Sequence, residues 1–196
     1  MRKIFVTENI SLDGVMQAPA MPDEDTRGGF TRGGWGNAYT DQVMIDYMTA
    51  GAGEEGCLLL GRTTYQTMAA TWPHMPEDNP FTGWINAMPK YVASTTLTAP
   101  LEWNAALLEG DAGSAVAAVK QSDGPDLNVL GSGVLVQTLR AAGLIDEYLL
   151  SIHPLLLGSG TRLFPDGAEA ELELLDSTTT TTGVIIARFR PRGGLS

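Results

Sequence analysis

The sequence has 196 residues, of which 43% are hydrophobic and 18% are charged, values that are ordinary for a globular protein. A chain of this length predicts one domain over residues 1–196. The formal net charge of −11 disfavours nucleic acid as a partner, because neutralising phosphates requires clustered Lys and Arg. An anionic ligand would therefore need a local positive site, for which Arg62 and Lys90 are candidates.

The compartment follows from cysteine usage and from the apolar runs. Cys57 is the single cysteine, which excludes an intramolecular disulfide and fits a reducing compartment. The apolar run within residues 1–6 is too short for a signal peptide. No stretch approaches the ~20 apolar residues of a membrane span. We therefore expect a cytoplasmic protein that has no membrane partner.

The first quarter of the chain predicts a strand, a long loop and a helix. Residues 3–7 are rich in β-branched and aromatic side chains, which is typical of a strand. Residues 14–36 are rich in Gly and Pro and predict a long loop, which in a compact domain is usually a functional lid or disordered. Residues 40–50 predict a helix with Thr40 as its N-cap.

The middle of the chain begins with a strand that runs into a helix. Residues 57–60 predict the buried strand, and residues 61–64 the turn into the helix. Residues 73–88 contain Pro and Gly and predict an irregular segment. Residues 90–93 predict a third strand, and residues 106–108 a short, weak one.

A second junction of strand and helix follows. Before this junction, Asp111 is a candidate N-cap for a helix that extends through Lys120. Residues 127–130 predict a strand, residues 131–133 a glycine turn into a helix, and residues 148–153 another strand. This order predicts a βαβ unit with a parallel pair of strands. Ligands bind beyond the carboxyl ends of such strands, so the glycine turn is a candidate ligand-binding edge.

The last quarter of the chain predicts two strands that pair with each other. Residues 171–175 and 184–189 are the strands, and residues 177–182 are the polar turn between them. This pattern predicts that the two strands pair in antiparallel orientation. Strands alternating with helices, closed by antiparallel strands, predict an α/β domain with a mixed sheet.

The turn formed by Gly61, Arg62, Thr63 and Thr64 has the chemistry of a phosphate site. It offers backbone N–H groups, two hydroxyls and a guanidinium at the start of a helix. The alternative, a plain turn with a solvated Arg62, stays open, and no P-loop Gly-Lys-Ser/Thr follows. Ser94 and Thr95 lie just past a strand and could supply hydroxyls to a second phosphate; the alternative is an ordinary polar loop.

Gly131, Ser132 and Gly133 form the second glycine-rich turn. Val136 stands where a dinucleotide fingerprint has its third glycine, so the motif is weak in itself. The position of the turn after a strand and before a helix strengthens its assignment to ligand binding. A serine hydrolase is a further alternative, because Ser132 precedes Asp146 and His153 in triad order, but no G-x-S-x-G occurs.

Two carboxylates are candidates for orienting a substrate or relaying a proton. Asp13 follows the first predicted strand, and its alternative role is turn formation in an Asp-Gly pair. Asp46 lies on the first predicted helix beside apolar positions, and its alternative is solvent exposure. His74 and His153 lack the spacing of metal ligands, so no metal site is expected.

Seven motifs occur in order along nearly the whole chain: Ser11–Gly14, Leu59–Tyr65, Met88–Ser94, Val129–Gly133, Leu144–Glu147, Pro154–Gly160 and Arg162–Phe164. Together they resemble the dihydrofolate reductase superfamily, and more closely bacterial proteins similar to the reductase domain of riboflavin biosynthesis. The resemblance implies a three-layer α/β fold with a mostly parallel sheet of about eight strands and antiparallel C-terminal strands. It also implies a small-molecule substrate and the possibility of a homodimer.

The resemblance further implies NADPH as the hydride donor. Residues 61–64 would then hold the phosphates on the adenosine side, with Arg62 as the partner of the 2′-phosphate, because a guanidinium is planar and permanently charged. Ser94 and Thr95 would lie near the 2′-phosphate and adenine. Residues 131–133 would pack their backbone against the pyrophosphate and the nicotinamide ribose. The loop after Asp13 would correspond to a mobile loop that closes over the nicotinamide.

Two departures from the riboflavin-pathway reductases leave the substrate open. Those reductases commonly have a Lys upstream of the Ser-Leu-Asp-Gly motif, where this chain has Thr7, Glu8 and Asn9, and Glu-Gly-Gly where it has residues 130–132. We therefore expect an NADPH-dependent reductase acting on a small heterocycle or carbonyl of pterin or pyrimidine type. A nucleotide-binding or sensing module without turnover is the alternative.

Overall fold

The structure is a computed structural model that describes residues 1–51, 56–79 and 81–193. Its contacts divide the chain into two units. Unit 1 comprises Met1–Val6 and Met48–Ile145, and unit 2 comprises Thr7–Tyr47 and Asp146–Ser196. The single domain over residues 1–196 stays a prediction.

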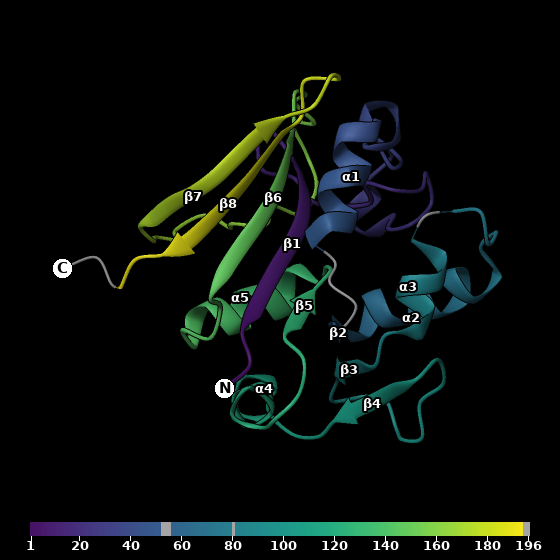
Figure 1. The fold of residues 1–196 in the computed structure, drawn as a ribbon, viewed down its shortest axis with the longest axis vertical. Helices are drawn as coiled ribbons and strands as arrows, with labels where there is room; N and C mark the ends of the chain where they lie inside the picture. Colours follow the sequence, from purple (N-terminus) through teal and green to yellow (C-terminus); the bar gives the residue numbers. More distant parts are fainter. Residues whose placement is uncertain (52–55, 80, 194–196) are drawn as a thin grey trace. The chain divides into compact units, whose positions relative to one another are not determined.

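The described residues form eight strands: β1 (Ile4–Ser11), β2 (Cys57–Gly61), β3 (Lys90–Ala93), β4 (Ala105–Leu108), β5 (Leu127–Val129), β6 (Glu147–His153), β7 (Leu172–Thr179) and β8 (Ile185–Pro191). Their order in the sheet is β4-β3-β2-β5-β1-β6-β8-β7 (Figure 1). The pairs β1–β5, β2–β5, β2–β3 and β3–β4 are parallel, whereas β8 is antiparallel to both β6 and β7. The predicted mixed sheet with antiparallel C-terminal strands is therefore confirmed.

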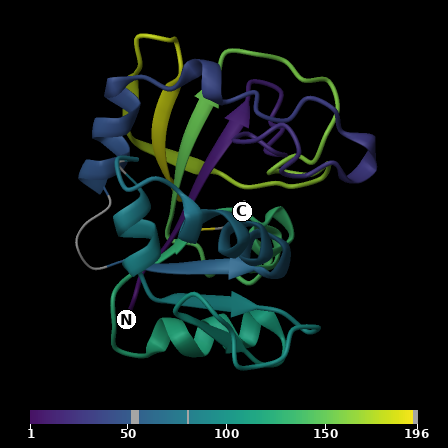
Figure 2. The same cartoon turned by 90° about the vertical axis from the view of Figure 1, so that its right-hand side faces the viewer.

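The described helices are α1 (Gln42–Gly51), α2 (Arg62–Thr71), α3 (Thr82–Ala87), α4 (Ala112–Gln121) and α5 (Gly133–Ala141), together with the 3-10 turns η1 (Arg27–Gly29), η2 (Asn37–Tyr39) and η3 (Trp72–His74). Within unit 1, α2 and α3 lie on one face of the strands and α4 and α5 on the other (Figures 1 and 2). No helix in the described ranges has the length and apolar character to cross a membrane.

The core of unit 1 explains the uninterrupted apolar run of β2. Every residue of β2 is buried, as expected for a strand whose two faces are both covered by helices. Leu58 and Leu60 pack with Tyr65 of α2 and Ile85 of α3. This burial fixes the end of β2, and with it the start of α2, in a rigid setting.

The predicted irregular segment over residues 73–88 is wrong in part, because it contains α3. Thr82 and Ile85 are buried, and the Thr82 hydroxyl donates to the carbonyl oxygen of Pro76 at 2.9 Å. A six-residue helix makes few bonds of its own. Tertiary contacts therefore stabilise it, and these are not visible in the local sequence.

Three further boundaries differ from the predictions. Asp41, not Thr40, caps α1, because its Oδ1 accepts a hydrogen bond from the Met44 N–H at 2.9 Å. β7 continues to Thr179, so the predicted turn over residues 177–182 is shorter, and the Thr180 N–H bonds the Val184 carbonyl across it. The predicted direct pairing of residues 127–130 with 148–153 is wrong, because β1 lies between β5 and β6.

Candidate functional site

Three neighbouring parallel strands of unit 1 end at a common edge, which we call the glycine edge. β3, β2 and β5 lie in this order, and parallel strands place their carboxyl ends together. Ser94 follows β3, Gly61 ends β2, and Gly131 follows β5. Helices α2 and α5 both begin at this edge (Figure 2). The structure therefore brings together the three segments that the sequence indicated for cofactor binding.

The two glycine-rich turns of this edge pack directly against each other. A Cβ added at Gly61 would lie 2.5 Å from Ser132 Oγ and 2.6 Å from Ser132 Cβ, closer than real side chains approach. Gly131 has a φ of 69°, a left-handed conformation that favours glycine. The peptide bond between Gly131 and Ser132 is cis. Glycine is therefore required at positions 61 and 131 for two different reasons.

The start of each helix presents backbone N–H groups to a ligand. Gly61 caps α2 and Ser132 caps α5, and neither forms a side-chain hydrogen bond to the first turn. The first N–H groups of a helix have no partner within it, and the helix dipole adds positive potential there. Two helix starts at one edge suit an anionic group such as phosphate.

Two cationic side chains, Lys90 and Arg62, were candidates for an anion site, and they differ in exposure to solvent. Lys90 is buried; its Nζ donates to the Met88 carbonyl at 2.6 Å and lies 4.1 Å from the centroid of the Trp103 ring. Burial lowers the pKa of Lys90 to about 8. Lys90 is thus committed to the protein interior, which corrects its place as a ligand candidate. Arg62 is exposed at the first position of α2 and forms no ion pair within the described part of the chain.

Ser94 and Thr95 occupy the turn after β3. The Ser94 hydroxyl oxygen accepts hydrogen bonds from the N–H groups of Thr96 and Leu97, each at 3.1 Å. This pattern stabilises the turn in the manner of a capping serine. Thr95 is exposed beside it. A role for the two residues near a 2′-phosphate stays a prediction.

Asp13 is held by three donors of unit 2. Its carboxylate accepts hydrogen bonds from Ser11 Oγ at 2.6 Å, the Leu157 N–H at 3.1 Å and the Gly158 N–H at 2.7 Å. The Ser11 hydroxyl, followed by the Leu157 N–H, lowers the pKa of Asp13 to about 2. A carboxyl group with that pKa carries no proton at neutral pH. Asp13 therefore positions the backbone after β6, and its role in orienting a substrate or relaying a proton stays a prediction.

Replacing Asp13 with asparagine tests this reading. An amide cannot accept all three bonds, so we expect the free energy of unfolding to fall by about 1 kcal/mol, a modest value because the site is partly exposed. Turnover should stay within a few fold, whereas removal of a true proton donor would lower kcat by about a hundredfold or more. Urea unfolding and steady-state kinetics measure both quantities. The exposed Asp123→Asn variant is the matched control.

Asp46 lies exposed on α1, where its Oδ1 accepts a hydrogen bond from Gln42 Nε2 at 2.7 Å. Its role toward a substrate stays a prediction. The sequence did not single out Asp41, whose Oδ2 accepts from the N–H of Thr181 at 2.6 Å and from its hydroxyl at 2.5 Å. The Thr181 hydroxyl lowers the pKa of Asp41. Among the described residues, no group of three or more acidic, His or Cys side chains could hold a metal ion.

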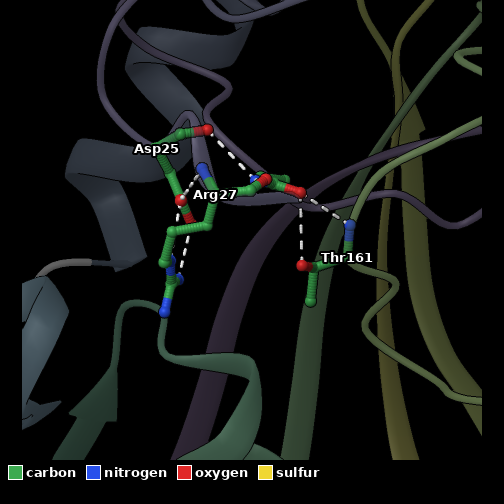
Figure 3. Close-up of polar contacts among 4 residues, drawn as sticks. Asp25, Arg27 and Thr161 are labelled. Atoms are coloured by element: carbon green, nitrogen blue, oxygen red, sulfur yellow. Dashed lines mark hydrogen bonds and ion pairs between the residues drawn. The ribbon is translucent and has the colours of Figure 1, made fainter. Parts of the chain in front are cut away.

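The long segment over residues 14–36 is tied together by Gln17. The buried Gln17 amide donates to the carbonyls of Asp25 at 3.1 Å and Arg27 at 3.0 Å, and its Oε1 accepts from the Thr161 N–H at 2.9 Å (Figure 3). Four residues of the segment, Val15, Ala18, Phe30 and Trp35, also form an apolar core together with Leu157. In this conformation the segment is therefore a packed wall of unit 2. Its closing motion stays a prediction.

His153 forms a cluster in unit 2 that the sequence did not indicate. His153 is 1% exposed, and its Nε2 lies 3.0 Å from Asn9 Oδ1. Its ring meets the rings of Trp35 and Tyr39 edge to face, at centroid distances of 5.1 and 5.4 Å. Its Nδ1 is buried and has no hydrogen-bond partner among the described residues. Burial lowers the pKa of His153 to about 4.

Solved structures of the same fold include the following two proteins. One, from Shewanella sp. PV-4, is provisionally named a riboflavin biosynthesis protein; it is 20% identical with a TM-score of 0.70, over 97% of this chain and 99% of that chain. The other is a pyrimidine reductase-like protein from Corynebacterium diphtheriae, 12% identical with a TM-score of 0.65, over 98% of this chain and 93% of that chain. At these identities the likeness shows the fold alone.

Sequence comparison extends this result. The chain is 31% identical over 102 residues, 52% of its length, to the uncharacterized protein YyaP of Bacillus subtilis strain 168, and the match spans about half, 54%, of that protein. The family model of the RibD C-terminal domain matches residues 2–186. This match confirms the resemblance to the reductase domain of riboflavin biosynthesis and the dihydrofolate reductase-like fold. The chain therefore belongs to the RibD C-terminal domain family.

Proposed function

We propose that the protein is an NADPH-dependent reductase that delivers hydride to a small heterocycle or carbonyl of pterin or pyrimidine type. The observation that carries the proposal is the glycine edge, where two helix starts, two packed glycine turns and the exposed Arg62 converge. Membership of a family of reductases supports it, as does the pyrimidine reductase-like structural relative.

The residues of the glycine edge fit a dinucleotide with an extra phosphate. The close contact of Gly61 with Ser132 holds the two turns side by side, so a phosphate at the edge would meet the backbone N–H groups of both helix starts. Arg62 would bind the 2′-phosphate through charge-assisted hydrogen bonds, and the hydroxyls of Thr63 and Thr64 would hold the neighbouring phosphate oxygens. Gly131, Ser132 and Gly133 would lie along the pyrophosphate, and Ser94 and Thr95 beside the adenosine end.

NADPH would supply the hydride, and the protein would position its reaction partner and exclude water. Asp13 fixes the backbone at residues 157–158 and so shapes a wall of unit 2. Because Asp13 stays ionised, the proton for the reduction would come from water, from the substrate itself or from another side chain, of which Asp46 is a candidate.

A nucleotide-binding module without turnover is the second candidate. The ionised state of Asp13 favours it, because this removes one of the two expected proton donors. A serine hydrolase has no such support. No described histidine bonds Ser132, and His153 Nε2 is already engaged by Asn9.

Turnover of NADPH distinguishes the candidates. We expect the absorbance of NADPH to fall when the protein meets at least one member of a panel of pterins, quinonoid compounds and aminopyrimidines. The product should carry deuterium when the cofactor is labelled at the nicotinamide C4 position. Tight NADPH binding with no turnover on any member would favour the binding module. Absence of both binding and turnover would contradict the proposal.

A further inference from the structure

The hydrogen bond between Asn9 and His153 fixes which ring nitrogen carries the proton. An amide oxygen can only accept, so His153 Nε2 must donate to Asn9 Oδ1 across their separation of 3.0 Å. Burial keeps the ring neutral, so Nδ1 then carries a lone pair and is an acceptor. That acceptor is buried and has no donor in the described chain. Buried polar atoms are seldom left in this state, because the loss of hydration is not offset.

The two aromatic rings that contact the imidazole of His153 are held very differently. Trp35 is 9% exposed, packs in the apolar core of the 14–36 segment, and its Nε1 donates to the Gln17 carbonyl at 2.7 Å. Tyr39 is half-buried, and its hydroxyl has no hydrogen-bond partner among the described residues. Asn37 and Thr40 beside it are exposed. Trp35 is therefore a fixed wall, whereas the Tyr39 ring can turn away at lower cost.

The backbone of Tyr39 is nevertheless anchored. The Thr182 hydroxyl donates to the Tyr39 carbonyl at 2.6 Å, and the Tyr39 N–H donates to the Gly36 carbonyl at 3.0 Å. The Thr181 N–H holds Asp41 at 2.6 Å two residues further along. A side chain on a fixed backbone moves by changing its rotamer, which takes nanoseconds or less when it is exposed. Such a change would remove the Tyr39 ring from its edge-to-face contact with the imidazole of His153 without unfolding the segment.

We propose that Asn9, Trp35, Tyr39 and His153 form a subsite for the N–H edge of a flat heterocycle, with His153 Nδ1 accepting one N–H of the ligand. Trp35 supplies a fixed apolar wall, and Tyr39 turns aside to admit the ring. This subsite rests on the proposed function in one respect, because the reducible heterocycle is its intended ligand. The acceptor selects for ligands whose ring nitrogen carries a hydrogen, and against the same rings when that nitrogen is methylated.

The probes are 6-aminouracil and its 1,3-dimethyl derivative, which lacks the ring N–H groups. The full chain has two histidines, so comparison with the His153→Gln variant assigns the imidazole nitrogen resonances of the labelled protein to His74 and His153. We expect the His153 Nδ1 resonance to move toward that of a hydrogen-bonded nitrogen with 6-aminouracil and to stay in place with the dimethyl compound. His74, exposed in unit 1, is the internal control.

Two substitutions of His153 distinguish the role of Nδ1 in ligand binding from that of Nε2. The amide of His153→Gln reaches the position of Nε2 and keeps the bond to Asn9, but removes the acceptor; it should weaken 6-aminouracil binding about tenfold. The oxygen of His153→Asn lies where Nδ1 lies, and this variant should recover most of that loss. Binding is measured by calorimetry on variants whose near-ultraviolet circular dichroism matches the parent.

Unchanged 6-aminouracil affinity in His153→Gln, equal binding of the dimethyl compound, or no binding to the parent protein would each overturn the subsite. NADPH affinity is measured in parallel. It should stay unchanged in both variants, because His153 is not among the residues assigned to the cofactor. If 6-aminouracil bound as expected while NADPH did not bind the parent, the subsite would stand and the reductase proposal would fail.

Discussion

Gly61→Ala is expected to weaken NADPH binding by at least about tenfold and to lower the free energy of unfolding by about 1–3 kcal/mol. The added Cβ would lie 2.5 Å from Ser132 Oγ, so one of the two turns at the glycine edge must shift. A shift there displaces the N–H groups at the start of α2 or α5. A phosphate bound by both helix starts would therefore lose contacts.

Two controls make this prediction specific. Gly83 lies in α3 of the same unit with open space around its Cα, so Gly83→Ala should raise the free energy of unfolding by about 0.5–1 kcal/mol. The double variant Gly61→Ala with Ser132→Gly removes the clashing atoms and should restore most of the lost stability. Urea unfolding and NADPH titration give both readouts. Full NADPH affinity in Gly61→Ala alone would show that the packed turns do not form the cofactor site.

Acid is expected to weaken the fold through His153. Burial lowers its pKa to about 4, against 6.5 for an exposed histidine. Between these pH values the unfolded chain binds a proton that the folded chain does not, so the folded state loses stability as the pH falls. The contribution is fully present above pH 6.5. It shrinks by about 3 kcal/mol as the pH falls to 4 and then levels off.

The free energy of urea unfolding, measured at several pH values between 7 and 4, tests this expectation. The parent should lose about 3 kcal/mol more than His153→Gln over that range, because glutamine does not titrate. Asp13 adds a separate loss at lower pH. Its pKa is lowered to about 2 from 3.8, so its contribution disappears only as the pH falls through that range. Parallel pH profiles for parent and variant would contradict the buried, neutral state of His153.

The elements that local sequence predicted well are those whose signal is itself local. β2 appears as a short apolar run and β3 as a short run that contains Tyr91 and Val92. Asp111 caps α4 by accepting a hydrogen bond from the Ser114 N–H at 2.9 Å, as its sequence position indicated. The glycine turns after β2 and β5 were visible for the same reason. Their assignment to a cofactor came from the resemblance to the reductases, and the parallel strands bring the two turns to one edge.

The features that the sequence did not reveal depend on contacts between distant residues. β1 enters the sheet between β5 and β6, and no local pattern encodes that neighbour. Asn9 meets His153 across 144 positions of sequence, so the cluster around His153 had no local signal beyond the end of a strand. Asp13 was recognised as important, but its donors at residues 157 and 158 were not, because they lie more than 140 positions away in the sequence.

In the proposed function, the glycine edge binds a dinucleotide that carries a 2′-phosphate, with Arg62 as its cation. Titration of intrinsic tryptophan fluorescence with NADPH and NADH, on the parent protein and on Arg62→Gln, tests it most directly. The parent is expected to prefer NADPH, and Arg62→Gln is expected to weaken NADPH binding about tenfold while leaving NADH binding nearly unchanged. Equal affinity of the parent for the two cofactors, or an Arg62→Gln variant that still prefers NADPH as the parent does, would contradict it.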